Sequence, residues 1–103
     1  MQNPTPSSAA REASVTVFVP GVLRDYSDGA ANLNMTASTV RAAFQQLEQR
    51  YPSLYRSVCD ETGAVRRHVN IFVNSFNTRD GDGLDTPLVP GDVVAILTAV
   101  SGG

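Results

Sequence analysis

Apolar and polar residues alternate with a period of two near the start of the chain. Every second position there holds a valine: Val15, Val17 and Val19. This period is typical of a strand with one buried face, and it directs Phe18 to the opposite face. The polar connection 22–29, with the turn signal Asp28-Gly29, and a second strand over 31–35 complete a predicted hairpin.

The hydrophobic spacing then changes to three and four residues, which predicts a helix. Its apolar positions are Val40, Ala43, Phe44, Leu47 and Tyr51. Ser38 is a residue type that caps helices, and Pro52 is expected to end this helix. Residues 53–58 continue the helical spacing and predict a short second turn or helix.

Aliphatic residues alternate with two asparagines and an aromatic ring over 69–74. This pattern predicts a strand in which Phe72 faces away from the core. Segment 75–87 is rich in Asn, Asp and Gly, which favours a turn-rich loop around a short edge strand, held on the core by Leu84 and Leu88. A calcium site is disfavoured because the closing glutamate of the calcium loop is missing.

An uninterrupted apolar run, Val93–Leu97, forms the last predicted strand. It indicates either a central strand covered on both sides or an exposed apolar patch. The order hairpin, helix, strand, loop, strand predicts an α+β fold, with one main helix packed on one face of a mixed sheet and the last strand beside the first. This is the β-grasp, or ubiquitin-like, arrangement.

The same pattern divides the chain into three segments. Residues 1–12 hold two prolines, two serines and few apolar groups, so we expect a disordered leader. Residues 13–98 form the predicted β-grasp domain. Residues 99–103 form a flexible tail that ends in Gly-Gly.

Apolar side chains also fall on the sheet face that the helix leaves open. They come from three neighbouring strands and are Phe18, Phe72, Ala95 and Leu97. We interpret this group as a partner-binding patch. The alternative is a smaller patch that is covered by loops.

Composition limits the kind of protein this is. A length of 103 residues with 42% hydrophobic content supports one compact domain. The net charge of -2 is scattered along the chain, which argues against nucleic-acid binding. The sequence has no apolar run of the roughly 20 residues that span a membrane, and its single cysteine suits a reducing compartment. We expect a soluble cytoplasmic protein that is a monomer on its own.

Few side chains offer chemistry of their own. Cys59 has no base or second thiol near it in sequence, so we interpret it as a small, semi-buried hydrophobe. His68 has no neighbouring metal-ligand pattern, and we predict no metal. With Arg66 and Arg67 it marks either the solvated start of a strand or a partner contact. All eight basic residues are arginines, so chains of this protein linked through lysine are excluded.

The end of the chain offers a reactive group. Its last residues are Ala99, Val100, Ser101, Gly102 and Gly103. The terminal carboxylate is an anion at neutral pH, and it can attack the α-phosphate of ATP if an enzyme holds it there. Glycine lets the chain lie in a narrow channel. Taken alone, two terminal glycines are a weak motif and favour a frayed terminus over a reactive one.

Two segments resemble the ubiquitin-like sulfur-carrier family (MoaD/ThiS-like). His68–Asn74 is similar to its third strand, and Gly91–Leu97 followed by Ala99–Gly103 is similar to its closing strand and tail. Within the family, the likeness is strongest to the carrier that feeds sulfur to a cysteine synthase. Thr98 stands where many relatives carry proline.

The resemblance implies a carrier rather than an enzyme. It implies that an E1-like adenylyltransferase activates Gly103 with ATP, and that a sulfur donor then leaves a thiocarboxylate on that residue. A sulfur-accepting synthase, either cysteine synthase-like or the molybdopterin synthase large subunit, would take the sulfur. No cofactor is expected on the chain itself. Two other functions stay open: a protein modifier conjugated through Gly103, and the small subunit of molybdopterin synthase.

Overall fold

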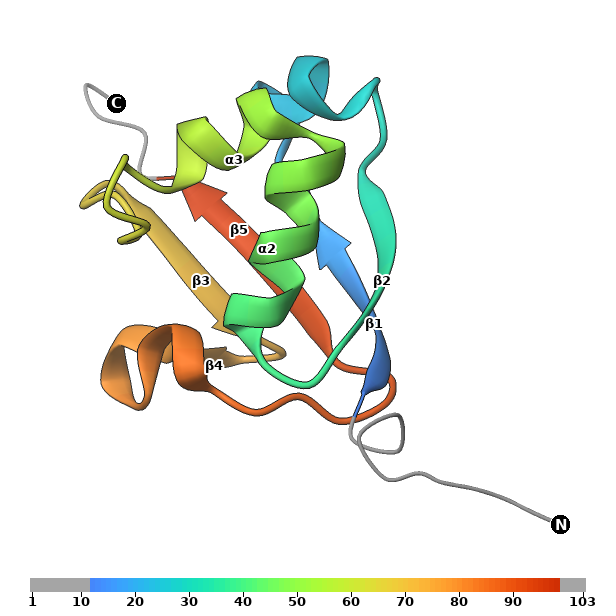
Figure 1. Cartoon of the computed structure of the whole chain (residues 1–103), viewed down its shortest axis with the longest axis vertical. Helices are drawn as coiled ribbons and strands as arrows, with labels where there is room; N and C mark the ends of the chain where they lie inside the picture. The colour runs from blue at the N-terminus through green and yellow to red at the C-terminus, as the bar shows by residue number, and fades with distance from the viewer. Residues whose placement is uncertain (1–11, 99–103) are drawn as a thin grey trace, which may run out of the picture.

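The computed structural model describes residues 12–98, which form one mixed sheet with helices on one face (Figure 1). The elements, with η for 3-10 helices, are β1 (Ala13–Phe18), η1 (Gly21–Ser27), β2 (Asn32–Ala37), α2 (Val40–Arg50), α3 (Pro52–Val58), β3 (Val69–Val73), β4 (Phe76–Asn77), η2 (Thr78–Asp80), η3 (Gly83–Asp85) and β5 (Val93–Thr98). Apart from Glu12, the leader predicted over 1–12 and the tail predicted over 99–103 lie outside the described residues.

The sheet has the strand order β2-β1-β5-β3-β4. β1 runs parallel to β5, which aligns Val17 with Val94, and β3 runs antiparallel to β5. The last strand therefore lies at the centre of the sheet, between the first strand and β3. Both α2 and α3 lie across one face of this sheet (Figure 1). These features confirm the predicted β-grasp arrangement.

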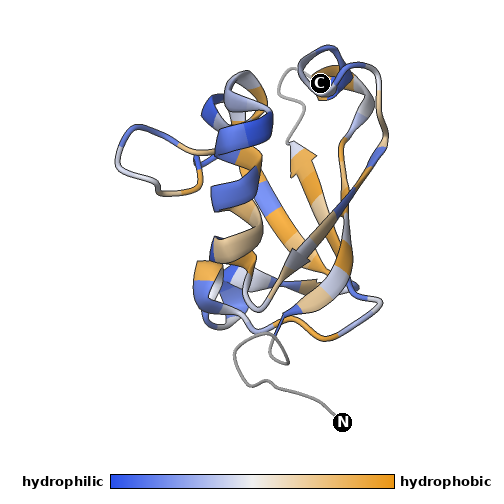
Figure 2. Ribbon diagram, turned by 45° about the vertical axis from the view of Figure 1, so that its right-hand side comes forward, coloured by the Kyte–Doolittle hydropathy of each residue, from blue (hydrophilic) through white to orange (hydrophobic). Residues whose placement is uncertain are grey.

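The core lies between the sheet and the helices. The sheet contributes buried aliphatic side chains from three strands: Val15, Val17, Ile71, Val94 and Ile96. From α2, Val40, Ala43, Phe44 and Leu47 are buried against them. Burying one aliphatic side chain of this size stabilises a fold by about 1.5–3 kcal/mol. Figure 2 shows the hydrophobic strands behind the helix, whose outer side is hydrophilic.

The connection between β1 and β2 differs from the predicted polar turn. It contains η1, a 3-10 helix that begins after Pro20 and ends at Ser27. Ser27 is fully buried, and its hydroxyl donates to the carbonyl of Ala30 at 2.7 Å. Asp28 then takes a left-handed conformation, with φ of 56°, that closes the segment. Seven residues with few regularly spaced apolar groups gave no periodic signal for this element.

The cap of α2 is one residue later than predicted. Thr39, not Ser38, is the N-cap, and its side chain accepts a hydrogen bond from the Ala42 amide at 3.1 Å. Ser38 instead uses its backbone carbonyl to accept from the Leu88 amide at 2.9 Å. This pairing keeps Ser38 in the extended segment that precedes the helix.

Pro52 follows the end of α2 and is also the first residue of α3. The first helix ends at Arg50, and Pro52 occupies the first turn of the second, where its missing amide hydrogen costs no hydrogen bond. Leu54 and Val58 on α3 are fully buried. The predicted short second helix is therefore confirmed, and the proline has a double role.

The apolar run of β5 is covered on one side only. Val94 and Ile96 are fully buried, whereas Val93 and Leu97 are each 39% exposed. Of the two alternatives for this run, the structure supports the exposed apolar patch. The predicted turn-rich loop precedes it: β4 is the short edge strand, Leu88 is buried and Leu84 is partly buried against the core.

Candidate functional site

The tail begins where the central strand ends. Thr98 is the last described residue, and it lies opposite Val69 in the β3–β5 ladder. Along its first half β5 also pairs with β1, so neighbours fix the strand on both edges. In Figure 1 the end of β5 lies at the same end of the sheet as η1, α3 and the start of β3. The predicted tail residues lie outside the described part: Ala99, Val100, Ser101, Gly102 and Gly103.

The open face of the sheet, which is the face away from α2, carries the predicted partner-binding residues. Phe18, Ala95 and Phe72 form one row across β1, β5 and β3, because Ala95 is aligned with both phenylalanines. Leu97 lies two residues further along β5, toward the tail. The structure thus brings these four side chains together on one surface. Their role in partner binding stays a prediction.

The exposure of this surface differs along β5. Leu97 and Val93 are each 39% exposed, while Phe18, Phe72 and Ala95 are half-buried. Val93 also lies on this face and was not among the predicted residues, although its two-residue spacing from Ala95 on the strand indicates it. These five residues form the apolar strip.

Arg24 of η1 borders the apolar strip. Its guanidinium carbon lies 5.6 Å from the centre of the Phe18 ring, within cation–π range. Its Nε donates to the carbonyl of Val19 at 3.0 Å. No sequence pattern places Arg24 here, because η1 carries no periodic apolar signal. Sequence reasoning therefore missed this cationic border.

Arg79 fastens the basic segment 66–68 to the start of β3. Its Nη2 donates to the carbonyls of Arg66 at 2.9 Å and Val69 at 2.6 Å, and its Nε donates to Asn70 Oδ1 at 3.1 Å. The side chains of residues 66–68 are exposed. The segment is thus the solvated start of a strand, and a partner contact by these side chains stays a prediction.

Cys59 is buried more deeply than the predicted semi-buried position. It is 1% exposed, and burial above all, with the nearby Asp60 carboxylate, raises the pKa of its thiol to about 11. The thiolate is the reactive form of cysteine, and at neutral pH this side chain stays protonated. Cys59 acts as a core residue, as the sequence indicated.

Within residues 12–98, no three His, Cys, Asp or Glu side chains are grouped as metal ligands would be. No helix in that range has the length and hydropathy needed to cross a membrane.

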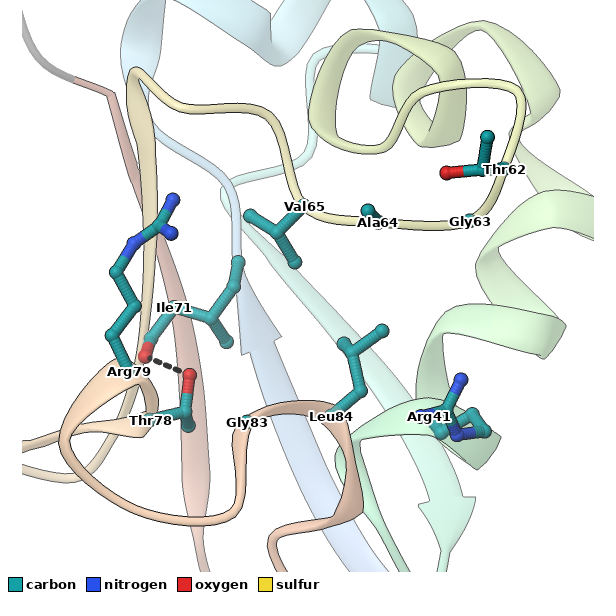
Figure 3. Close-up of a pocket in the computed structure, with 10 residues that line it drawn as sticks. All are labelled: Arg41, Thr62, Gly63, Ala64, Val65, Ile71, Thr78, Arg79, Gly83 and Leu84. Atoms are coloured by element: carbon teal, nitrogen blue, oxygen red, sulfur yellow. Dashed lines mark hydrogen bonds between the residues drawn. The ribbon is translucent and has the colours of Figure 1, made fainter.

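A hollow of about 460 Å³ lies beside the outer edge of β3 (Figure 3). Val65, Ile71 and Leu84 line its apolar part, and Arg41 at its border pairs with Asp85 at 3.0 Å. Its lining residues include no carboxylate, cysteine or histidine. The hollow therefore has no acid–base pair, and the reactive group predicted for this chain lies elsewhere, on its tail.

The sequence over residues 17–103 matches the ThiS family. The sulfur carrier protein CysO of Mycobacterium tuberculosis is 36% identical over 92 residues, which cover 87% of this chain and 99% of the relative. The family match includes the two terminal glycines, Gly102 and Gly103.

Solved structures of similar proteins share the fold. Mycobacterium tuberculosis CysO has a TM-score of 0.77 and 35% identity, over 84% of this chain and 99% of the neighbour. A chain of the Amycolatopsis orientalis BexX/CysO complex has a TM-score of 0.79 and 30% identity, over 86% and 99%. The small archaeal modifier protein 1 of Methanosarcina acetivorans has a TM-score of 0.76 and 31% identity, over 89% and 98%.

The family match extends from within β1 to the last residue, and the β-grasp topology agrees with that of the similar structures. This protein belongs to the ThiS family.

Proposed function

We propose that this chain is a sulfur carrier whose Gly103 carboxylate is adenylated and then converted to a thiocarboxylate. The observation that carries the proposal is the family match through Gly103, together with a relative named as a sulfur carrier protein. The geometry supports it, because a central strand presents the start of the tail beside an exposed apolar surface.

The first step activates the carboxylate. An E1-like adenylyltransferase holds ATP, a carboxylate oxygen of Gly103 attacks the α-phosphate, and pyrophosphate leaves. The product is an acyl-adenylate. Because glycine has no Cβ, the last two residues fit a narrow channel of that enzyme. This chain contributes the carboxylate, and its partner contributes the nucleotide site.

The second step introduces sulfur. The terminal sulfur of a donor persulfide attacks the activated carbonyl carbon, and AMP leaves as the acyl disulfide forms. A second thiol of the donor then attacks the donor's own sulfur in that disulfide, which forms a disulfide on the donor and frees the thiocarboxylate on Gly103. Hydrosulfide as donor gives the thiocarboxylate directly. The carrier is a co-substrate of these reactions rather than an enzyme.

The apolar strip is the proposed docking surface for the partners. Leu97 and Val93 expose apolar area next to half-buried aromatic rings, and the centre of a protein interface is typically apolar with aromatic groups. The strip lies on the strand that leads into the tail. A partner that docks on the strip therefore has Gly103 within reach, at most the length of tail residues 99–103 from the end of β5.

The proposed acceptor is a cysteine synthase-like enzyme, in line with the similarity to CysO. A pterin acceptor, served by a molybdopterin synthase large subunit, is the alternative. The thiocarboxylate form, incubated with each candidate enzyme and its acceptor substrate, should lose its sulfur to one of them. Because the steps consume ATP and reduced sulfur, we place them in the reducing cytoplasm.

The test of carrier function is the intact mass of the protein. Co-expression with the E1-like adenylyltransferase and sulfur donor of the same genome should add the mass difference between sulfur and oxygen at the C-terminus. A variant extended by one residue beyond Gly103 is the control and should stay unmodified. An unmodified native chain under the same conditions, or modification of the untrimmed extension, would refute the proposal.

The similarity to small archaeal modifier protein 1 favours a second candidate, conjugation to other proteins. A lysine amine of a target would then attack the carbonyl carbon of the same acyl-adenylate, and AMP would leave as the isopeptide bond forms. Digestion of cell extracts should yield branched Gly-Gly remnants on target lysines if this function holds. Stable co-purification with a large pterin-converting subunit would instead indicate the small subunit of molybdopterin synthase.

A further inference from the structure

The open face of the sheet is uncharged at every strand position of β1, β2, β3 and β5. The apolar strip forms its centre. Around it lie polar, uncharged side chains: Ser14, Thr16, Asn32, Asn34, Thr36 and Asn70. Any charge that a docked partner meets on this face therefore comes from segments beside the sheet.

Arg24 supplies a charge at the β1 side of the face. The contact of its guanidinium with the Phe18 ring places it at the β1 end of the row that Phe18 forms with Ala95. Of its five N–H donors, only the one on Nε forms a hydrogen bond within the described residues, to Val19. Neither Nη group forms a hydrogen bond with the described residues.

Arg79 supplies a second charge at the β3 side. It holds the side chain of Asn70, which lies opposite Leu97 in the β3–β5 ladder. Its Nε and Nη2 are occupied by the chain, while Nη1 forms no hydrogen bond within the described residues. Figure 3 shows this side chain running beside β3. The two arginines thus flank the tail-proximal part of the apolar strip.

Neither arginine is neutralised by the described part of the chain. The single ion pair in residues 12–98 joins Arg41 to Asp85. Asp25 and Asp80 directly follow the two arginines in sequence, yet neither forms an ion pair with them. An uncharged face with an unpaired cation on each flank is complementary to a surface with an apolar centre and carboxylates on both sides.

We propose that Arg24 and Arg79 bind carboxylates of the activating enzyme on either side of the apolar strip. This inference rests on the proposed function, since the partner is the enzyme that adenylates Gly103. The arginines set which partner docks and how the strip is aligned on it, because charge complementarity contributes to specificity and register. They touch neither ATP nor the reacting carboxylate, so they are binding residues.

The test measures ATP–pyrophosphate exchange by the E1-like adenylyltransferase of the same genome, with the full chain as the varied substrate. Arg24→Glu should raise the KM for the chain about tenfold with little change in kcat, because docking and not chemistry is weakened. Arg24→Lys should restore most of the affinity. Arg56→Glu on α3 makes the same change in net charge on the helix side and is the matched control.

Arg79 needs a gentler substitution because the chain uses its Nε and Nη2. Arg79→Lys keeps the charge and Arg79→Gln removes it. Both lose the guanidinium, whose planar set of N–H donors holds residues 66–70. Both variants should lose the same melting temperature relative to the native chain. The KM for the chain should therefore rise more for Arg79→Gln than for Arg79→Lys, because only Arg79→Gln also loses the charge. If both variants unfold, the Arg24 series and the salt dependence decide the matter.

Ionic strength gives an independent measurement on the native chain. Raising the salt from about 0.1 M to about 1 M shortens the Debye length from about 10 Å to about 3 Å. The KM of the native chain should rise with salt, and the difference between it and Arg24→Glu should shrink. Equal KM values for Arg24→Glu and Arg56→Glu at low salt would overturn the inference while leaving the carrier function intact. No exchange with the native chain would refute the proposed function itself, and this inference with it.

Discussion

Thr98 lies opposite Val69, at the point where the central strand ends. Val69 is fully buried, its amide donates to the Arg66 carbonyl at 3.0 Å, and its own carbonyl accepts from Arg79. The start of β3, which pairs with the end of β5, is therefore held by several hydrogen bonds. From this fixed position the reach of the Gly103 carboxylate depends on the number of residues that follow, at about 3.3–3.6 Å each.

Deleting Ala99 should impair activation without affecting the fold. The deletion shortens the maximal reach by about 3.5 Å, and a misplacement of about 1 Å can cost about a hundredfold in rate. We expect adenylation to fall at least that far in a pyrophosphate-exchange assay. The free energy of unfolding should stay that of the native chain. Ala99→Gly keeps the length and should retain activity; equal activity of the deletion would show that reach is not limiting.

Replacing Thr39 by alanine should destabilise the domain by about 1 kcal/mol, because the Ala42 amide loses its capping acceptor. Ser38→Ala is the matched comparison, since the hydrogen bond that Ser38 accepts uses its backbone carbonyl. Urea denaturation of both variants measures the difference. A larger loss for Ser38→Ala than for Thr39→Ala would contradict the cap seen in the structure.

Stability should fall at alkaline pH through Cys59. The pKa of its thiol is about 11 in the folded protein against an ordinary value of 9.0, and burial is the main cause. Above pH 9 the unfolded chain loses this proton while the folded chain keeps it, so the free energy of unfolding decreases as pH rises toward about 11. Below pH 9 the contribution is fully present.

The measurement compares the native chain with Cys59→Ala by denaturation from about pH 8 to about pH 10.5. The native chain should lose more stability over this range than the variant. Both proteins keep Tyr55, whose pKa is raised mainly by burial and in part by Cys59, so the difference between the two slopes reports the Cys59 thiol together with its effect on Tyr55. Equal slopes in the two proteins would show that the thiol does not titrate differently on folding.

Periodic segments allowed most of the fold to be predicted. The alternation of Val15 and Val17, and the helical spacing of Phe44 and Leu47, gave the strands and the main helix, and all four residues are buried. Each of these segments buries one face along its whole length, so its pattern of hydrophobic residues follows which side chains are buried. The order of such elements then limited the topology to a few choices.

The remaining features depend on contacts that no periodic pattern records. Arg24 contacts the Phe18 ring from η1, an element with no periodic apolar pattern. The shift of the helix cap from Ser38 to Thr39 depends on Leu88, fifty positions further along the chain by sequence number. Such pairings leave no local signal, which is why the apolar part of the candidate site could be predicted and its charged border could not.

Leu97 and Ile96 are neighbours on β5 and face opposite sides of the sheet. Substitutions at these two positions therefore test docking and folding separately. Leu97 is 39% exposed on the open face, whereas Ile96 is fully buried under the helix. Leu97→Asp should leave the melting temperature close to that of the native chain. It should raise the KM in activation at least about tenfold, since it puts an unpaired carboxylate at the centre of an apolar interface. Ile96→Asp should prevent folding, because the core offers that carboxylate no partner.

Thr36→Asp adds the same charge at the β2 margin of the open face and should alter neither property much. If Leu97→Asp is activated as well as Thr36→Asp, the apolar strip is not the docking surface.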